Sequence, residues 1–117
     1  MPSTTNQPLT SAIPQPDRRL HPRYSVRVQA ELYREGSDIP VRTETTDLGQ
    51  GGCYVRLSQT LTPGNYVDGN FWLDGQQVRF RGRVVTRHPQ FGNGIMFLEL
   101  DGNGEHLLER YLQAIAL

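Results

Sequence analysis

The chain has 117 residues with 12 basic and 12 acidic side chains, so its formal net charge is zero, and every basic residue is arginine. This length allows one domain, and a neutral chain is a poor candidate for a general binder of nucleic acid or membrane surfaces, because such proteins carry an excess of basic residues. A single cysteine, Cys53, excludes an internal disulfide and a four-cysteine metal site.

The first segment, residues 1–16, carries no charged side chain, four prolines and many small polar residues. This composition cannot bury enough apolar surface to offset the entropy lost on ordering, and it lacks the basic and apolar parts of a secretory signal. No apolar run in the chain approaches the ~20 residues that span a bilayer. We therefore expect a disordered tail over residues 1–17, one domain over residues 18–117, no membrane insertion and a cytoplasmic location.

Strands separated by turns follow from residue 24 onward. Residues 26–32 alternate between apolar and polar side chains, which is the period of a half-buried strand. Turns that contain glycine or proline divide the rest into further segments of strand composition. The predicted strands cover residues 26–32, 41–48, 53–57, 66–73, 78–87 and 94–100.

The last segment has helical spacing. Five apolar residues fall within one arc of about 140° on a helical projection, namely Leu107, Leu108, Tyr111, Leu112 and Ile115. Asn103 is expected to cap this helix, with Glu105 in the first turn at the positive end of the helix dipole. Because the apolar face must dock on a sheet, and because closure removes exposed edges, we predict an all-β fold: a six-stranded antiparallel β-barrel with a C-terminal α-helix packed on it.

A cluster of arginines marks the junction of tail and barrel. Arg18, Arg19, Arg23 and Arg27 have no acidic residue among them. The residue before Pro22 is pushed away from helical geometry, so Arg19 and Arg23 would lie on an extended arm from which both guanidinium groups can wrap a phosphate. The alternative is an ordinary solvated basic linker.

A glycine-rich turn, residues 47–52, ends the second predicted strand. Gly49, Gly51 and Gly52 allow a ligand to approach the main chain closely. Asp47 only accepts hydrogen bonds, so it would accept from the N–H groups of a purine such as guanine. The alternative is a tight turn between two strands.

A stripe of arginines, Arg79, Arg81, Arg83 and Arg87, shares one face of the strand predicted over residues 78–87. It is either the ordinary outer face of a barrel strand, paired with acidic residues on neighbouring strands, or an extension of a ligand site. In the second case Arg83 and Arg87 would supply secondary ligand contacts.

No residue pattern predicts catalysis. No Ser or Cys shares a recognisable motif with His, and the three histidines lack ligand spacing. Cys53 follows two glycines within a strand pattern and is expected to be a small buried residue rather than a nucleophile, while Trp72 is expected to pack rather than to stack on bases. We therefore expect no enzyme activity, no catalytic residue, no metal and no cofactor.

Taken in order, these features resemble the PilZ domain family of bacterial receptors for cyclic di-GMP. The family pattern has Arg-x-x-x-Arg before the first strand, matched here by Arg19 and Arg23. It continues with [Asp/Asn]-x-Ser-x-x-Gly, matched by Asp47 and Gly52, and it ends on an amphipathic helix. The resemblance covers nearly the whole chain beyond the tail.

The resemblance implies a barrel with the nucleotide bound on its outer surface. Arg19 and Arg23 would contact phosphate and the Hoogsteen edge of guanine, and Asp47 would accept from the Watson–Crick edge. Gly52 would keep the turn open. Arg18 stands just before the first motif, a place that in this family often accompanies two stacked ligand molecules per domain.

One position departs from the family pattern, because Gly49 stands where the motif has serine. A missing hydroxyl hydrogen bond is worth about 0.5–1.5 kcal/mol, which is roughly a 2- to 13-fold loss of affinity. We therefore expect Gly49 to lie in the ligand site and to weaken binding there.

The resulting hypothesis is a cyclic di-GMP receptor whose Arg-rich arm orders on binding and signals to a separate protein, in the regulation of motility or biofilm formation. The first alternative is a protein-interaction adaptor of the same fold that has lost the nucleotide, with Gly49 as the first sign. A second is an oligonucleotide-binding barrel that uses the face from Arg79 to Arg87. The zero net charge counts against that last hypothesis, so we expect no nucleic-acid partner.

Overall fold

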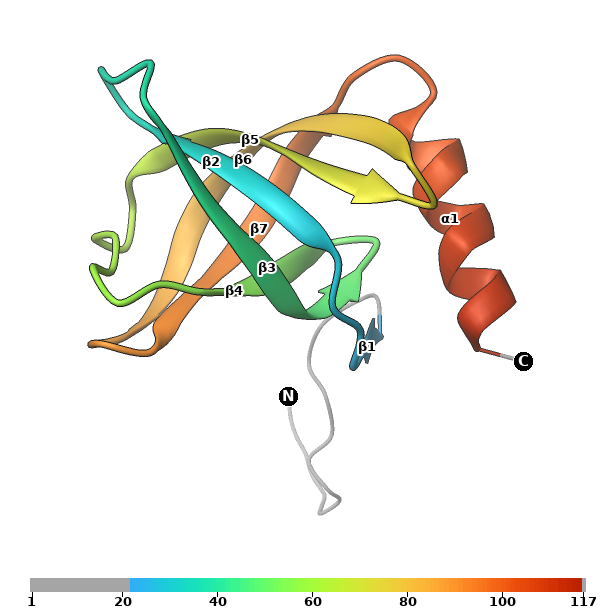
Figure 1. Cartoon of the computed structure of the whole chain (residues 1–117), viewed down its shortest axis with the longest axis horizontal. Helices are drawn as coiled ribbons and strands as arrows, with labels where there is room; N and C mark the ends of the chain where they lie inside the picture. The colour runs from blue at the N-terminus through green and yellow to red at the C-terminus, as the bar shows by residue number, and fades with distance from the viewer. Residues whose placement is uncertain (1–21, 117) are drawn as a thin grey trace, which may run out of the picture.

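The computed structural model describes residues 22–116 of the chain (Figure 1). This part contains the strands β1 (Arg23–Tyr24), β2 (Gln29–Arg34), β3 (Pro40–Gly49), β4 (Gly52–Arg56), β5 (Tyr66–Leu73), β6 (Gln76–His88) and β7 (Gly92–Leu100), followed by the helix α1 (Gly104–Ile115). The predicted tail over residues 1–17 lies outside the described residues, as do Arg18 and Arg19.

Six of the strands close into an antiparallel barrel. Their order around it is β3, β2, β5, β6, β7, β4, and the pairing of β4 with β3 completes the ring. Along β6, buried residues alternate with exposed ones, which matches the alternation of apolar and polar side chains in the sequence. The predicted six-stranded barrel is therefore confirmed, and the end of β3 extends beyond its pairing with β2, which leaves an edge there for another strand.

A seventh strand, β1, was missing from the prediction. It is only two residues long, and it pairs with the end of β3 in the register Arg23 to Gly49 and Tyr24 to Leu48. Two residues are too few to show a period in sequence. Their strand conformation comes from the neighbouring edge of β3, which becomes available only once the barrel has formed.

The strand predicted from residue 26 begins instead at Gln29. The reason is a side chain of β3: Thr45 Oγ1 accepts a hydrogen bond from the Val28 N–H at 3.0 Å and donates one to the Val26 carbonyl at 2.8 Å. These two bonds take the place of ladder hydrogen bonds in the connection between β1 and β2. Val28 still faces the core and is buried, so the alternation pattern was correct although the start of the strand was wrong.

The helix α1 closes one end of the barrel, beside the tip of the β5–β6 hairpin (Figure 1). Leu108 and Leu112 are buried and Leu107 packs against the core, as the helical spacing predicted, but Ile115 is exposed. Asn103 does occupy the N-cap position, but its side chain makes no capping hydrogen bond. No helix within residues 22–116 is both long and apolar enough to cross a membrane.

The ten residues of β3 separate two ends of the barrel by about 30 Å. The β2–β3 turn lies at one end, whereas β1 and the β3–β4 turn lie at the other, on the side where α1 ends (Figure 1). The motif residues of β1, β3 and β4 all gather at this second end, so the topology itself defines where a site is to be sought.

Candidate functional site

The centre of the candidate site is an ion pair between the two predicted motifs. Arg23 Nη1 on β1 lies 3.1 Å from Asp47 Oδ1 on β3, although the two residues are 24 positions apart in sequence. The Arg23 side chain is 13% exposed and that of Asp47 is 34% exposed. The pair is therefore partly shielded from water, where such a contact is stronger than on an open surface.

Two glycines lie against the Arg23 side chain. A Cβ atom built on Gly49 would lie 3.1 Å from Arg23 Cγ, and a Cβ atom on Gly52 would lie 3.1 Å from Arg23 Nη2. The aliphatic part of the arginine thus passes next to Gly49, and its charged end lies beside Gly52. Neither glycine faces open space: a Cβ atom on Gly49 would also lie 2.5 Å from the Pro22 carbonyl oxygen, and one on Gly52 would overlap the Ile95 carbonyl oxygen.

The pair offers a ligand two kinds of hydrogen-bonding group side by side. The guanidinium of Arg23 only donates, and it has N–H groups beyond the one that meets Asp47. The carboxylate of Asp47 only accepts, and it is the more exposed partner. A flat ring with acceptors on one edge and donors on the next matches this arrangement.

Cys53 lies in the core next to this pair and plays no chemical part in it. Burial raises the pKa of the Cys53 thiol to about 12; the nearby charge of Arg23 acts to lower it and that of Asp47 to raise it. At neutral pH the sulfur is therefore protonated and enclosed. The prediction that Cys53 is a small buried residue is confirmed.

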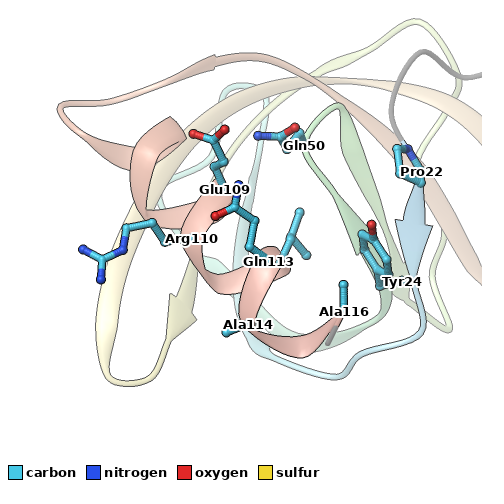
Figure 2. A pocket seen from close by; sticks show the side chains of 9 residues that line it. Pro22, Tyr24, Gln50, Glu109, Arg110, Gln113, Ala114 and Ala116 are labelled. Atoms are coloured by element: carbon cyan, nitrogen blue, oxygen red, sulfur yellow. The ribbon is translucent and has the colours of Figure 1, made fainter.

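A groove of about 680 Å³ runs beside β1, between that strand and the C-terminal half of α1 (Figure 2). Pro22 and Tyr24 line one side, Gln113 lines the opposite side, and Gln50 from the β3–β4 turn stands between them at one end (Figure 2). Tyr24, Gln50 and Gln113 were not among the candidate site residues predicted from the sequence. No local pattern marks them, because they meet only when the helix and β1 dock on the same end of the barrel.

Arg83 lies across the barrel surface from the ion pair. It stands opposite Met96 of β7, and Met96 stands opposite Gly52 of β4, so Arg83 and Gly52 are two strand spacings apart, about 10 Å. The side chains of Arg83 and Met96 are both exposed. Arg83 therefore shares the outer face with the site but does not contact Arg23.

The other predicted secondary contact, Arg87, lies further along β6 and is engaged with the β4–β5 loop. Its Nε donates to Thr60 Oγ1 at 2.9 Å, and Arg83 Nε donates to the Gly64 carbonyl at 3.3 Å. Arg81, from the same stripe, forms an ion pair with Asp68 of the adjacent strand at 3.1 Å. For Arg81 the reading as an ordinary paired outer face is confirmed.

Three comparisons place these features among known proteins. The sequence profile of the PilZ domain matches residues 17–114. The structure of the Bacillus subtilis inhibitor of motility (MotI/DgrA) is similar, with a TM-score of 0.69 and 17% identity, covering 86% of this chain and 52% of that one. The PilZ domain of CeSA from a cellulose-synthesizing bacterium has a TM-score of 0.62 and 22% identity, covering 81% of this chain and 98% of that one.

Both solved structures share less than a quarter of their aligned residues with this chain, so they support a shared fold but not a shared function. The chain spans about half the length of MotI/DgrA, since the match covers 52% of that protein. No protein of curated function matches the sequence.

Proposed function

Because the chain belongs to the PilZ domain family, we propose that it is a receptor for cyclic di-GMP. The observation that carries the proposal is the Arg23–Asp47 pair, 3.1 Å apart and half-shielded at one end of the barrel. Arg23 donates to the O6 and N7 acceptors of a guanine, and Asp47 accepts from its N1 and N2 hydrogens. The same pair of edges is what distinguishes guanine from adenine, so the site is selective for the base.

Arg18 and Arg19 complete the site in this proposal. They lie outside the described residues, four and three positions before Pro22, which lines the groove beside β1. Their guanidinium groups bind the two phosphates of the ligand, for which a planar, bidentate donor is well suited. Arg18 additionally favours a stacked pair of ligand molecules, with Arg83 and Arg87 as contacts of the more distant one.

The output of the receptor passes to a separate protein. Arg23 and Tyr24 already pair with β3, so the change on binding concerns the arm before Pro22, which the nucleotide holds against the barrel. A partner then recognises the altered surface at this end. MotI/DgrA is named as an inhibitor of motility, and control of motility or biofilm formation is the class of process that we propose here too.

The adaptor hypothesis, in which the ligand has been lost, rested on Gly49. A Cβ atom at this position would lie 2.5 Å from the carbonyl oxygen of Pro22. Glycine is therefore required there by the packing of this chain, whether or not a ligand binds. Because packing alone accounts for glycine at position 49, the missing motif serine no longer favours the adaptor over the receptor.

Calorimetric titration with cyclic di-GMP tests the proposal. We expect the wild type to bind and Arg23→Ala to lose about 10- to 150-fold in affinity, which corresponds to about 1.5–3 kcal/mol for a hydrogen-bonded charged group. Arg81→Ala is the matched control, because it removes an arginine that pairs with Asp68 away from the site. No heat of binding with the wild type, or equal affinities for the wild type and Arg23→Ala, would refute the proposal.

A further inference from the structure

We propose that Gly49 is a positioning residue that allows Pro22 and β1, the end of the arginine arm that lies against β3, to dock on the barrel. Serine, the residue of the family motif at this position, would displace this part of the arm rather than improve the site. The inference rests on the proposed function only where it concerns affinity. Its structural part concerns the docking of β1, which exists in the free protein and is measured without ligand.

The space at Gly49 is filled by the arm itself. A Cβ atom there would lie 2.5 Å from the backbone carbonyl oxygen of Pro22, 3.1 Å from Arg23 Cγ and 3.4 Å from Arg23 Cα. Real Cβ atoms essentially never come closer than 3.0 Å to another heavy atom. The closest obstacle is backbone rather than the end of a flexible side chain, so any side chain at position 49 forces two segments of main chain apart.

Of the two segments, β1 is the one that yields. At Leu48 the strand β3 pairs on one side with β4, a member of the closed barrel, and on the other side with β1. The whole β1 ladder consists of two register pairs, Arg23 with Gly49 and Tyr24 with Leu48. Displacing one of two pairs costs far less than opening the ring of six strands.

Release of β1 would dismantle the candidate site. The contact of Arg23 with Asp47, and its position beside Gly52, both depend on β1 lying against the end of β3. Pro22 and Tyr24 would also leave the groove that they line. In this chain, strand pairing therefore holds the arginine in place before any ligand arrives, and Gly49 is what permits that pairing.

Gly52 provides a contrast within the same turn. A Cβ atom there would overlap the carbonyl oxygen of Ile95, which belongs to β7 in the wall of the barrel. Gly52→Ala must therefore deform the barrel itself. Substitutions at the two glycines should therefore have different effects. A side chain at Gly49 should displace β1 without affecting the barrel, whereas a side chain at Gly52 should lower the stability of the barrel.

The first experiment compares Gly49→Ala and Gly49→Ser in the full chain without ligand, by NMR and thermal unfolding. The two variants share the added Cβ atom and differ only in the hydroxyl. We expect both to lose the cross-strand NOEs of the pairs 23–49 and 24–48 while keeping a melting temperature within about 5 °C of the wild type, and Gly52→Ala to melt clearly lower. Persistence of those NOEs in Gly49→Ala would overturn the inference.

The second experiment titrates the same variants with cyclic di-GMP. If the docked population falls to about one tenth, the apparent affinity falls about tenfold in both Gly49 variants. Tighter binding by Gly49→Ser than by the wild type would overturn the inference in favour of the motif hydroxyl. If the wild type binds no nucleotide, the proposed function fails, and the NOE comparison still decides whether Gly49 docks the arm.

Discussion

Thr45 fastens the connection between β1 and β2 to the barrel, and its replacement by valine tests this directly. The residue is fully buried in β3. Its hydroxyl accepts from the Val28 N–H at 3.0 Å and donates to the Val26 carbonyl at 2.8 Å. Valine has nearly the same shape but no hydroxyl, so Thr45→Val leaves both backbone groups without a partner and changes little else.

The size of the effect follows from the burial of the two groups. An orphaned buried donor or acceptor costs about 1–3 kcal/mol. Val28 is buried, so its N–H carries the larger share, whereas Val26 is half-buried and its carbonyl is within easier reach of water. We expect a total loss of about 2–4 kcal/mol in the free energy of unfolding, equivalent to a fall in melting temperature of about 10–25 °C for a domain of this size.

Urea unfolding followed by circular dichroism measures this loss, with Thr46→Val as the control. Thr46 is the next residue on β3, is half-buried, and makes no side-chain hydrogen bond among residues 22–116, so its replacement should change stability by less than about 0.5 kcal/mol. If Thr45→Val were as stable as Thr46→Val, the hydroxyl would not be what fastens this connection.

Two further predictions concern the site and its surroundings. Arg23→Lys keeps the charge but removes the planar fork, so we expect cyclic di-GMP binding at least about tenfold weaker than for the wild type at matched ionic strength, and unchanged affinity would contradict the assigned role. Because burial raises the pKa of Cys53 from 9.0 to about 12, the folded state keeps its proton while the unfolded state loses it. The free energy of unfolding should therefore fall as the pH rises above about 9, by at most about 1.4 kcal/mol per pH unit. The variant Cys53→Ala, which lacks the thiol, serves as the reference. If the free energy of unfolding of the two proteins depended on pH in the same way, the pKa of the Cys53 thiol would not be raised by burial.

The strands and turns were predictable because their signals are local. The hairpin between β5 and β6 is an example: Asp74 and Gly75 both have positive φ, at 50° and 83°, which is the conformation that this pair of residues favours in a two-residue turn. The buried face of α1 was likewise visible as helical spacing. The Asn103 capping bond that the sequence favoured is absent: Asn103 lies at φ −96° and ψ 24°, outside the extended conformation from which an N-cap side chain usually reaches the N–H groups of the second and third helical residues.

The chemistry of the site was also visible in the motifs, but its geometry was not. Arg23 and Asp47 were chosen as a donor and an acceptor from their residue types and their order. That they contact each other, 24 positions apart, depends on β1 finding the free side of β3. Tyr24 and Gln113 gave no signal of their own, and Gln50 lay in the glycine-rich turn without any mark of its role. The groove between β1 and α1 forms only when both elements dock on the same end of the barrel.

Gly49 is the position where the sequence and the tertiary structure give the most different interpretations. Alternation, turn residues and motif order are properties of neighbouring residues, so the sequence alone established the barrel, the closing helix and the types of side chain at one end of it. In the sequence Gly49 was a motif position that lacked its hydroxyl. The structure places the Pro22 carbonyl 2.5 Å from where its Cβ would lie, and so makes it the residue that lets the arm dock. A contact of that kind depends on two distant segments meeting within a few ångströms, and only the closed barrel brings them there.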